Sequence, residues 1–316
     1  MTGSAGTLHA SFDHEAIFYD DPGELSSALA PTILGALDRH ESVLVSLTED
    51  RWDLLARHLG DRARHVAQFP AGDRYARPPV AFAMLHKFVT EAVASGARTV
   101  WSIGEIAFTG SLPDEDWLRY EQAVTDLLCD LPLRAVCAYD TSALAAEVLD
   151  GACITHLNVQ GHRDEDSDLK TGRPPRAIVA PAMPMPAGRP LVDRRDPADI
   201  GELRAAVRAT LTGQIPRTTL DDVELVVSEL ATNATGHGTL PTCAKVWLEA
   251  GAVTVTVADA GGGPPARYPE LRAPDGRVGG LGLWISGQVA DRLHFAHDSA
   301  GWTATATFWI TQGVRG

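Results

Sequence analysis

The chain has 316 residues, of which 45% are hydrophobic and 22% are charged, and its formal net charge is -14. Phosphate binding needs clustered basic residues, but lysine occurs only as Lys87, Lys170 and Lys245, so we expect no direct nucleic-acid partner. No apolar run approaches the roughly 20 residues that cross a bilayer, and the N-terminus has no secretory signal pattern. These features predict a soluble cytoplasmic protein of two globular domains, without a membrane partner.

The four cysteines, Cys129, Cys137, Cys153 and Cys243, form no C-x-x-C pair and have no histidine at zinc-finger spacing. We therefore interpret them as small buried residues of a protein in a reducing compartment.

Residues 10–158 alternate short apolar runs with longer amphipathic runs. The short runs have the length and the β-branched or aromatic content of strands, and the longer ones repeat apolar residues at helical spacing. Strands alternating with helices predict an α/β domain with a mostly parallel sheet covered by helices. The phosphate loop G-x-x-x-x-G-K-[ST] is absent from it. The predicted strands lie near residues 16–19, 42–47, 65–69, 98–106, 134–139 and 154–159.

Residues 159–190 contain an acidic cluster followed by a stretch dense in proline. Proline removes backbone donors and favours extended geometry, while the acidic run stays solvated, so this segment predicts a linker.

Residues 191–316 have a different pattern, in which two helices precede most of the strands. Helices packed on one side of an antiparallel or mixed sheet, an α+β sandwich, are the expected architecture. The predicted helices are 197–214, 219–238 and 282–293, and the predicted strands are 243–250, 252–260, 294–298 and 302–310.

The helix predicted at 219–238 carries a line of polar residues beside its apolar face. Glu229, Asn233 and His237 recur every four residues, and such a line alone is typical of the exposed face of an amphipathic helix. For His237, at the end of the helix, a favourable interaction with the helix dipole is the preferred interpretation.

Two glycine motifs downstream change the interpretation of Glu229 and Asn233. Asp259 ends a predicted strand just before Gly261 and Gly263, so its carboxylate can accept from an exocyclic amine while the backbone approaches a flat ring. Residues 279–282 lead into a helix, where free amides and the helix dipole favour an anion. Each motif alone is a weak signal.

In this order, the three motifs resemble the N box and the two glycine boxes of the GHKL ATP-binding fold. The form "SELATNATGHG" and the short segment between the glycine boxes are most similar to the bacterial anti-sigma-factor serine kinases. The matching residues are Glu229 and Asn233 in E-x-x-x-N, Asp259, Gly261 and Gly263 in D-x-G-x-G, and Gly280, Gly282 and Leu283 in G-x-G-L.

The resemblance implies ATP and Mg²⁺ as cofactors and a role for each matching residue. Asn233 is implied to coordinate Mg²⁺ on the ATP phosphates, Asp259 to hold the adenine amine, and Glu229 to act as general base for a serine or threonine. The glycines of the second box are implied to wrap the phosphates. Thr303 lies where the family often has a threonine near the adenine.

The same resemblance implies a sigma factor and its antagonist protein as partners. A histidine kinase is disfavoured, because the helix predicted at 197–214 contains no histidine that could accept a phosphoryl group. The irregular glycine boxes leave a second interpretation open, in which the domain is a nucleotide-dependent switch that binds a partner without catalysis. A homodimer through this domain is also left open.

The first domain resembles the MEDS sensory domain, a degenerate relative of recombinase-like ATPases. The resemblance rests on His14, the strand "IFY" and the helix that leads to "ESVLVSLT", and it implies that the domain senses a small organic molecule. Strand-end residues could line a pocket, although packing in the core is the stronger interpretation and no metal is expected among them. The candidates are His14, Tyr19, His86, Trp101 and Glu105.

Overall fold

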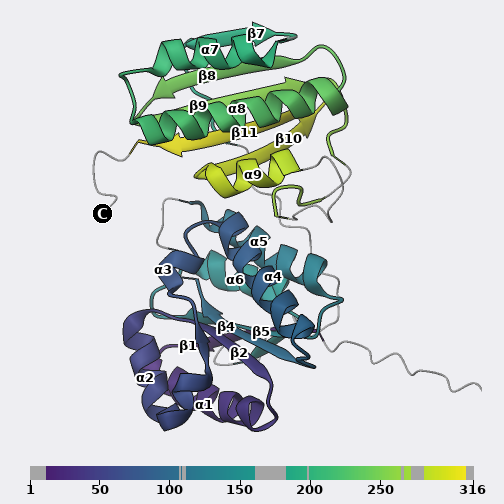
Figure 1. Cartoon of the computed structure of the whole chain (residues 1–316). Helices are drawn as coiled ribbons and strands as arrows, with labels where there is room; N and C mark the ends of the chain where they lie inside the picture. Colours follow the sequence, from purple (N-terminus) through teal and green to yellow (C-terminus); the bar gives the residue numbers. More distant parts are fainter. Residues whose placement is uncertain are drawn as a thin grey trace, which may run out of the picture. The chain divides into compact units, whose positions relative to one another are not determined.

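The chain forms two compact units, Met1–Val179 and Ala180–Gly316, drawn in Figure 1. None of the helices in the described ranges combines the length and apolarity that a membrane span requires. The computed structural model describes residues 12–106, 108, 112–160, 183–197, 199–264, 267–271 and 281–310.

The first unit contains a six-stranded sheet in the order β3-β2-β4-β5-β1-β6. All of its strand pairs are parallel, which confirms the predicted α/β architecture. The strands are β1 (Asp13–Tyr19), β2 (Ser42–Ser46), β3 (Ala67–Gln68), β4 (Val100–Glu105), β5 (Leu133–Asp140) and β6 (Asn158–Gln160).

Helices cover both faces of this sheet (Figure 1). On one face, Leu29 and Ile33 of α1 pack in one core with Ile103 of β4. On the other face, Leu149 of α6 packs with Phe18 of β1. The helices are α1 (Pro22–Asp38), α2 (Glu49–Leu59), the 3₁₀ helix η1 (Gly60–His65), α3 (Ala71–Arg74), α4 (Pro78–Ala94), α5 (Asp114–Leu128) and α6 (Ala146–Thr155).

The end of the first unit differs from the prediction. Strand β6 pairs with β1 and extends to Gln160, so residues 159 and 160, which we predicted as the start of the linker, belong to the sheet. Residues 161–182, which contain the acidic cluster and three of the six prolines of the predicted linker, lie outside the described residues.

The second unit contains a five-stranded antiparallel sheet in the order β10-β11-β9-β8-β7. Three helices lie on one face of it (Figure 1), which confirms the α+β sandwich. The elements are β7 (Val192–Arg195), α7 (Ile200–Leu211), α8 (Arg217–His237), β8 (Cys243–Glu249), β9 (Ala252–Asp259), α9 (Leu281–Val289), β10 (Arg292–Asp298) and β11 (Gly301–Trp309).

The edge strand β7 is absent from our prediction. Only Val192 of its four residues is buried, and the other three are exposed and charged. Charged side chains are a common protection for a strand at the edge of a sheet, but they remove the hydrophobic alternation by which a strand is recognised.

The cysteines are free, and none of them is fully buried, which contradicts our interpretation. Cys129 is exposed, whereas Cys137, Cys153 and Cys243 are half-buried. Cys129 follows the last residue of α5, so it lies beyond the face of that helix that packs on the sheet.

Helices α7 and α8 are joined by an ion pair at a buried position. Glu224 of α8 is buried, and both of its oxygens lie 2.7 Å from Arg208 of α7. Arg204 lies farther away, 3.9 Å from the same carboxylate. Both oxygens of the buried carboxylate are paired with the same guanidinium group. This bidentate ion pair links α7 to α8 at Arg208.

Replacing Arg208 by alanine is expected to lower the free energy of unfolding, because it leaves a buried carboxylate without its main partner. Urea unfolding of the full chain measures this change. Arg204→Ala is the matched control and should have a smaller effect. Equal unfolding midpoints for wild type and Arg208→Ala would show that the pair does not stabilise the fold.

Candidate functional site

The predicted catalytic line on α8 lies at the boundary between the core and the surface. Leu230 and Ala234 are buried in the core, and Glu229 and Asn233 beside them are half-buried. His237 is the last residue of the helix and is exposed. Glu229 and Asn233 therefore face a neighbouring element, unlike an ordinary solvent-facing stripe.

That neighbour is the first turn of α9. Gly282 is buried there, and a Cβ atom on it would lie 2.7 Å from Glu229 Oε2 and 2.8 Å from Asn233 Nδ2. Only a glycine lets the backbone approach these two side chains so closely. Leu283 packs against the hydrophobic core and anchors this turn, while Gly280 lies outside the described residues.

Asn233 carries an unpaired polar atom at this point. Its Nδ2 is buried and has no hydrogen-bond partner among the described residues. An unmade hydrogen bond of this kind costs free energy, and the nitrogen and oxygen of a side-chain amide can exchange places by rotation. Asn233 can therefore offer an amide oxygen to a magnesium ion or an amide nitrogen to a phosphate, which fits the cofactor that the sequence implies.

Asp259 is fixed at the end of β9, next to the end of α8. It is buried, and its Oδ1 accepts from the backbone N–H of Gly261 at 2.7 Å and of Thr239 at 3.2 Å. Ala260 in turn donates to the carbonyl oxygen of Thr239 at 2.8 Å. Within the described ranges no hydrogen bond reaches Oδ2, so this oxygen can accept from a ligand amine.

Gly263 and Thr303 are placed by the register of β9 and β11. Gly263 has a φ of +75°, and a Cβ atom there would clash with the ring of Trp302. Trp302 pairs with Asp259, whereas Thr303 pairs with Ala258. Successive strand residues point to opposite faces, so the structure places Thr303 on the face away from Asp259 and does not bring it to the site. Trp302, which our sequence analysis missed, is on the face of Asp259.

The predicted pocket residues of the first unit only partly come together. The Tyr19 hydroxyl donates to Glu105, and Arg51 lies 2.7 Å from Tyr19 Oη and 2.8 Å from Asp140 Oδ2. Burial raises the pKa of Tyr19 and the pKa of Glu105. This cluster lies at the carboxyl ends of β1, β4 and β5, where open parallel sheets bind ligands.

The other three predicted pocket residues lie elsewhere. Trp101 donates from Nε1 to Glu41 at 2.8 Å, His86 stacks on Phe82 within α4, and His14 is buried near the start of β1. A cavity of about 350 Å³ is nevertheless lined by two members of the set, Tyr19 and Trp101. Its lining also includes Glu15, Leu29 and Gln160.

The second unit thus has helices on one face of an antiparallel sheet, with Glu229 and Asn233 against a glycine turn and Asp259 at a strand end. This fold and arrangement define an ATPase domain of the GHKL type. Residues 194–308 match the family model described as "Histidine kinase-like ATPase domain". Residues 13–157 match the model "MEDS: MEthanogen/methylotroph, DcmR Sensory domain". The chain joins a MEDS domain to a histidine kinase-like ATPase domain.

Two solved structures show similarity to parts of the chain. The first contains the RsbU and RsbW domains of Rv1364c from Mycobacterium tuberculosis, with 20% identity, a TM-score of 0.29, and coverage of 39% of this chain and 34% of that chain. The second is the histidine kinase domain of the E. coli osmosensor EnvZ, with 19% identity, a TM-score of 0.24, and coverage of 42% and 97%. At these TM-scores neither similarity carries a functional argument. No curated protein matches the chain.

The two family matches support a regulatory role for the chain, in which a sensory domain is fused to an ATP-dependent, kinase-like domain.

Proposed function

We propose that residues 194–308 bind Mg-ATP and transfer its γ-phosphoryl group to a serine or threonine of an antagonist protein, and so control a sigma factor. The observation that carries this proposal is the close approach of the Gly282 backbone to both Glu229 and Asn233, which leaves no room for a Cβ atom. It joins a carboxylate, a buried amide and the start of a helix in one place. The proposal also rests on the match to the histidine kinase-like ATPase domain.

Three parts of the site hold the nucleotide in this proposal. The free Oδ2 of Asp259 accepts from the adenine amine, and Gly261 and Gly263 let the backbone approach the ring. Asn233 offers its amide oxygen to Mg²⁺, and the start of α9 at Gly282 faces the phosphates. When bound, Mg-ATP supplies a γ-phosphoryl group whose charge is partly neutralised by the metal.

Glu229 is the proposed general base. Its half-buried carboxylate lies beside Gly282, where the phosphates are expected. The oxygen of the partner's hydroxyl forms a bond to phosphorus while the bond from phosphorus to the ADP oxygen breaks, and the hydroxyl proton moves to the Glu229 carboxylate. Serine or threonine is proposed as acceptor because α7, the helix upstream of α8, contains no histidine.

The first domain is proposed to tune this activity by binding a small organic molecule in the cavity beside Tyr19. The volume of about 350 Å³ suits a small ligand. The lining includes the acidic residues Glu15, Asp20 and Glu24, which disfavour an anion, and apolar side chains of α1 and β1, which favour a ligand with a hydrophobic part.

A non-catalytic switch is the second candidate function, and the position of Trp302 favours it. This large side chain is paired with Asp259, contacts Gly263 and stacks on Phe295 with ring centroids 5.0 Å apart. An indole in this place narrows the space beside Asp259. In this candidate function the domain binds nucleotide and partner but transfers no phosphoryl group.

Calorimetry of the full chain with Mg-ATP tests the proposal. Replacing Asp259 by asparagine is expected to weaken Mg-ATP binding by about 10- to 100-fold, since a hydrogen bond to a charged group contributes about 1.5–3 kcal/mol. Asp221→Asn, at an exposed position of α8, is the control and should bind like wild type.

Mg-ATP binding and phosphoryl transfer together distinguish the kinase from the non-catalytic switch. Binding together with phosphoserine or phosphothreonine formation on an antagonist protein supports the kinase. Binding without transfer favours the switch, and a wild-type chain that does not bind Mg-ATP would refute both.

A further inference from the structure

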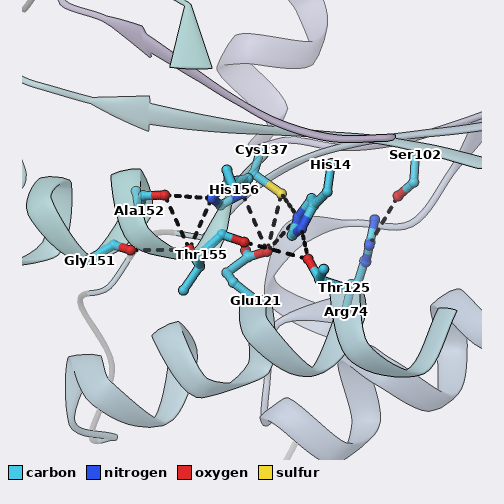
Figure 2. Close-up of polar contacts among 10 residues, drawn as sticks. All are labelled: His14, Arg74, Ser102, Glu121, Thr125, Cys137, Gly151, Ala152, Thr155 and His156. Carbon is cyan, nitrogen blue, oxygen red and sulfur yellow. Dashed lines mark hydrogen bonds and ion pairs between the residues drawn. The ribbon is translucent and has the colours of Figure 1, made fainter. Parts of the chain in front are cut away.

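A cluster of four side chains in the MEDS domain, three of them buried and Cys137 half-buried, has no part in the function proposed above. Figure 2 shows His14, Glu121, Cys137 and His156 converging on one point. They come from β1, from α5, from β5 and from the residue that follows α6. Their four nearest ligand atoms all lie within 4.8 Å of one another.

Four of the distances between these atoms are close to those between the ligand atoms of one metal ion. Glu121 Oε2 lies 3.0 Å from His14 Nε2, 3.3 Å from Cys137 Sγ and 3.7 Å from His156 Nε2. His14 Nε2 lies 3.4 Å from Cys137 Sγ. Tetrahedral bonds of about 2.0–2.3 Å to nitrogen, oxygen and sulfur place neighbouring ligand atoms about 3.3–3.6 Å apart.

The hydrogen bonds of His156 fix which of its ring nitrogens carries a lone pair. Nδ1 lies 2.9 Å from the carbonyl oxygen of Ala152, which can only accept, so Nδ1 carries the proton. In the neutral ring Nε2 therefore holds the lone pair, and it lies 3.7 Å from Glu121 Oε2. This Nε2 is buried and has no hydrogen-bond partner among the described residues.

His14 is held in the same way. Its Nδ1 lies 2.8 Å from Thr125 Oγ1, and that hydroxyl donates to the carbonyl oxygen of Thr155 at 3.5 Å. Thr125 therefore accepts from the Nδ1–H of His14, and Nε2 of His14 faces the cluster. Histidines that bind metals commonly donate their other ring N–H to an oxygen in this manner.

Protonation of one histidine leaves another polar atom of the cluster without a hydrogen-bond partner. A proton on His14 Nε2 pairs it with Glu121, but the buried lone pair of His156 Nε2 then remains without a donor, at a cost in free energy. A divalent cation satisfies all four atoms. Two neutral imidazoles, one carboxylate and one thiolate also neutralise a charge of +2, as a site removed from water requires.

We propose that His14, Glu121, Cys137 and His156 bind one divalent transition-metal ion of the zinc class in tetrahedral geometry. Two imidazoles, a thiolate and a carboxylate are ligands that Zn²⁺ accepts. Binding forms the metal–sulfur bond as the thiol proton of Cys137 passes to water. Four protein ligands leave no open position, so the ion ties the first strand to the end of the last helix of the domain and has a structural role.

The first test is the metal content of the full chain, produced without a polyhistidine tag and refolded with Zn²⁺. One zinc ion per chain is expected by elemental analysis. Replacement by Co²⁺ should give a thiolate-to-cobalt charge-transfer band in the near ultraviolet, a readout that needs no variant. A wild-type chain that refolds without stoichiometric zinc would overturn the proposal.

Variants identify the ligands. Cys137→Ser and His156→Gln should each lower the zinc content and weaken or abolish the cobalt bands, and Cys137→Ser should remove the charge-transfer band. Cys153→Ser is the matched control, because Cys153 is also half-buried in this domain but lies outside the cluster, and it should keep both signals. Circular dichroism separates loss of the ion from loss of the fold. A folded Cys137→Ser chain with an unchanged cobalt spectrum would refute the site.

Discussion

Replacing Glu229 by glutamine is expected to lower phosphoryl transfer by about 10²- to 10⁴-fold, the usual contribution of a general base. Glutamine keeps the size of the side chain beside Gly282 but cannot take up the hydroxyl proton. Because the proposed contacts to adenine and magnesium come from Asp259 and Asn233, the affinity for Mg-ATP should stay close to that of wild type. Transfer to the antagonist protein and calorimetry on the same preparation measure the two effects.

The matched control for Glu229 is Glu202→Gln, at an exposed position in the first turn of α7. Its transfer rate should equal that of wild type. A Glu229→Gln chain that still transfers at the wild-type rate would remove Glu229 from the reaction. If it lost Mg-ATP binding instead, the carboxylate would be acting on the nucleotide and not on the acceptor hydroxyl.

Replacing Gly282 by alanine is the second change with a large expected effect. The new Cβ would lie 2.7 Å from Glu229 Oε2 and 2.8 Å from Asn233 Nδ2. Both atoms are at the ends of side chains that can rotate, so the fold should survive while Glu229 and Asn233 are displaced. We expect Mg-ATP binding to weaken about tenfold or more, which corresponds to at least about 1.4 kcal/mol, and transfer to fall as well.

Gly236→Ala provides the comparison for this variant. Gly236 is a glycine of α8 whose added Cβ would meet no atom within 4 Å. This change should leave Mg-ATP binding intact and stabilise the helix by up to about 1 kcal/mol. Equal nucleotide affinities for the Gly282→Ala and Gly236→Ala chains would mean that the contact at the start of α9 does not form part of the site.

Hydrophobic periodicity was sufficient to predict both architectures. Strand-length runs between amphipathic runs predicted the parallel sheet, because such strands are buried on both faces. Periodicity failed at β7, where charged residues on an exposed edge hide the strand. It also placed β6 too early, near residues 154–159, because the three residues of β6 are all exposed and the more apolar run before them begins at the end of α6. Both strands are short and lie at sheet edges, so their sequences carry little of the pattern of a buried strand.

The candidate site was predictable to the extent that local spacing determines it. Residues four apart on a helix share a face, so Glu229 and Asn233 could be paired from the sequence. The position of Thr303 depends on strand register, and a shift of one residue moves a side chain to the other face of a sheet. The cluster of His14, Glu121, Cys137 and His156 could not be predicted from the sequence. Its members come from four separate elements, and only the tertiary fold brings them together.

The edge strand β6 of the first domain has a consequence for ligand binding. Strand β6 is held by β1 alone, at the edge of the sheet, and its last residue, Gln160, also lines the cavity beside Tyr19. A ligand in that cavity would therefore touch the end of an edge strand. Three residues of pairing at an edge contribute little stability, so such a ligand would favour the paired state of β6.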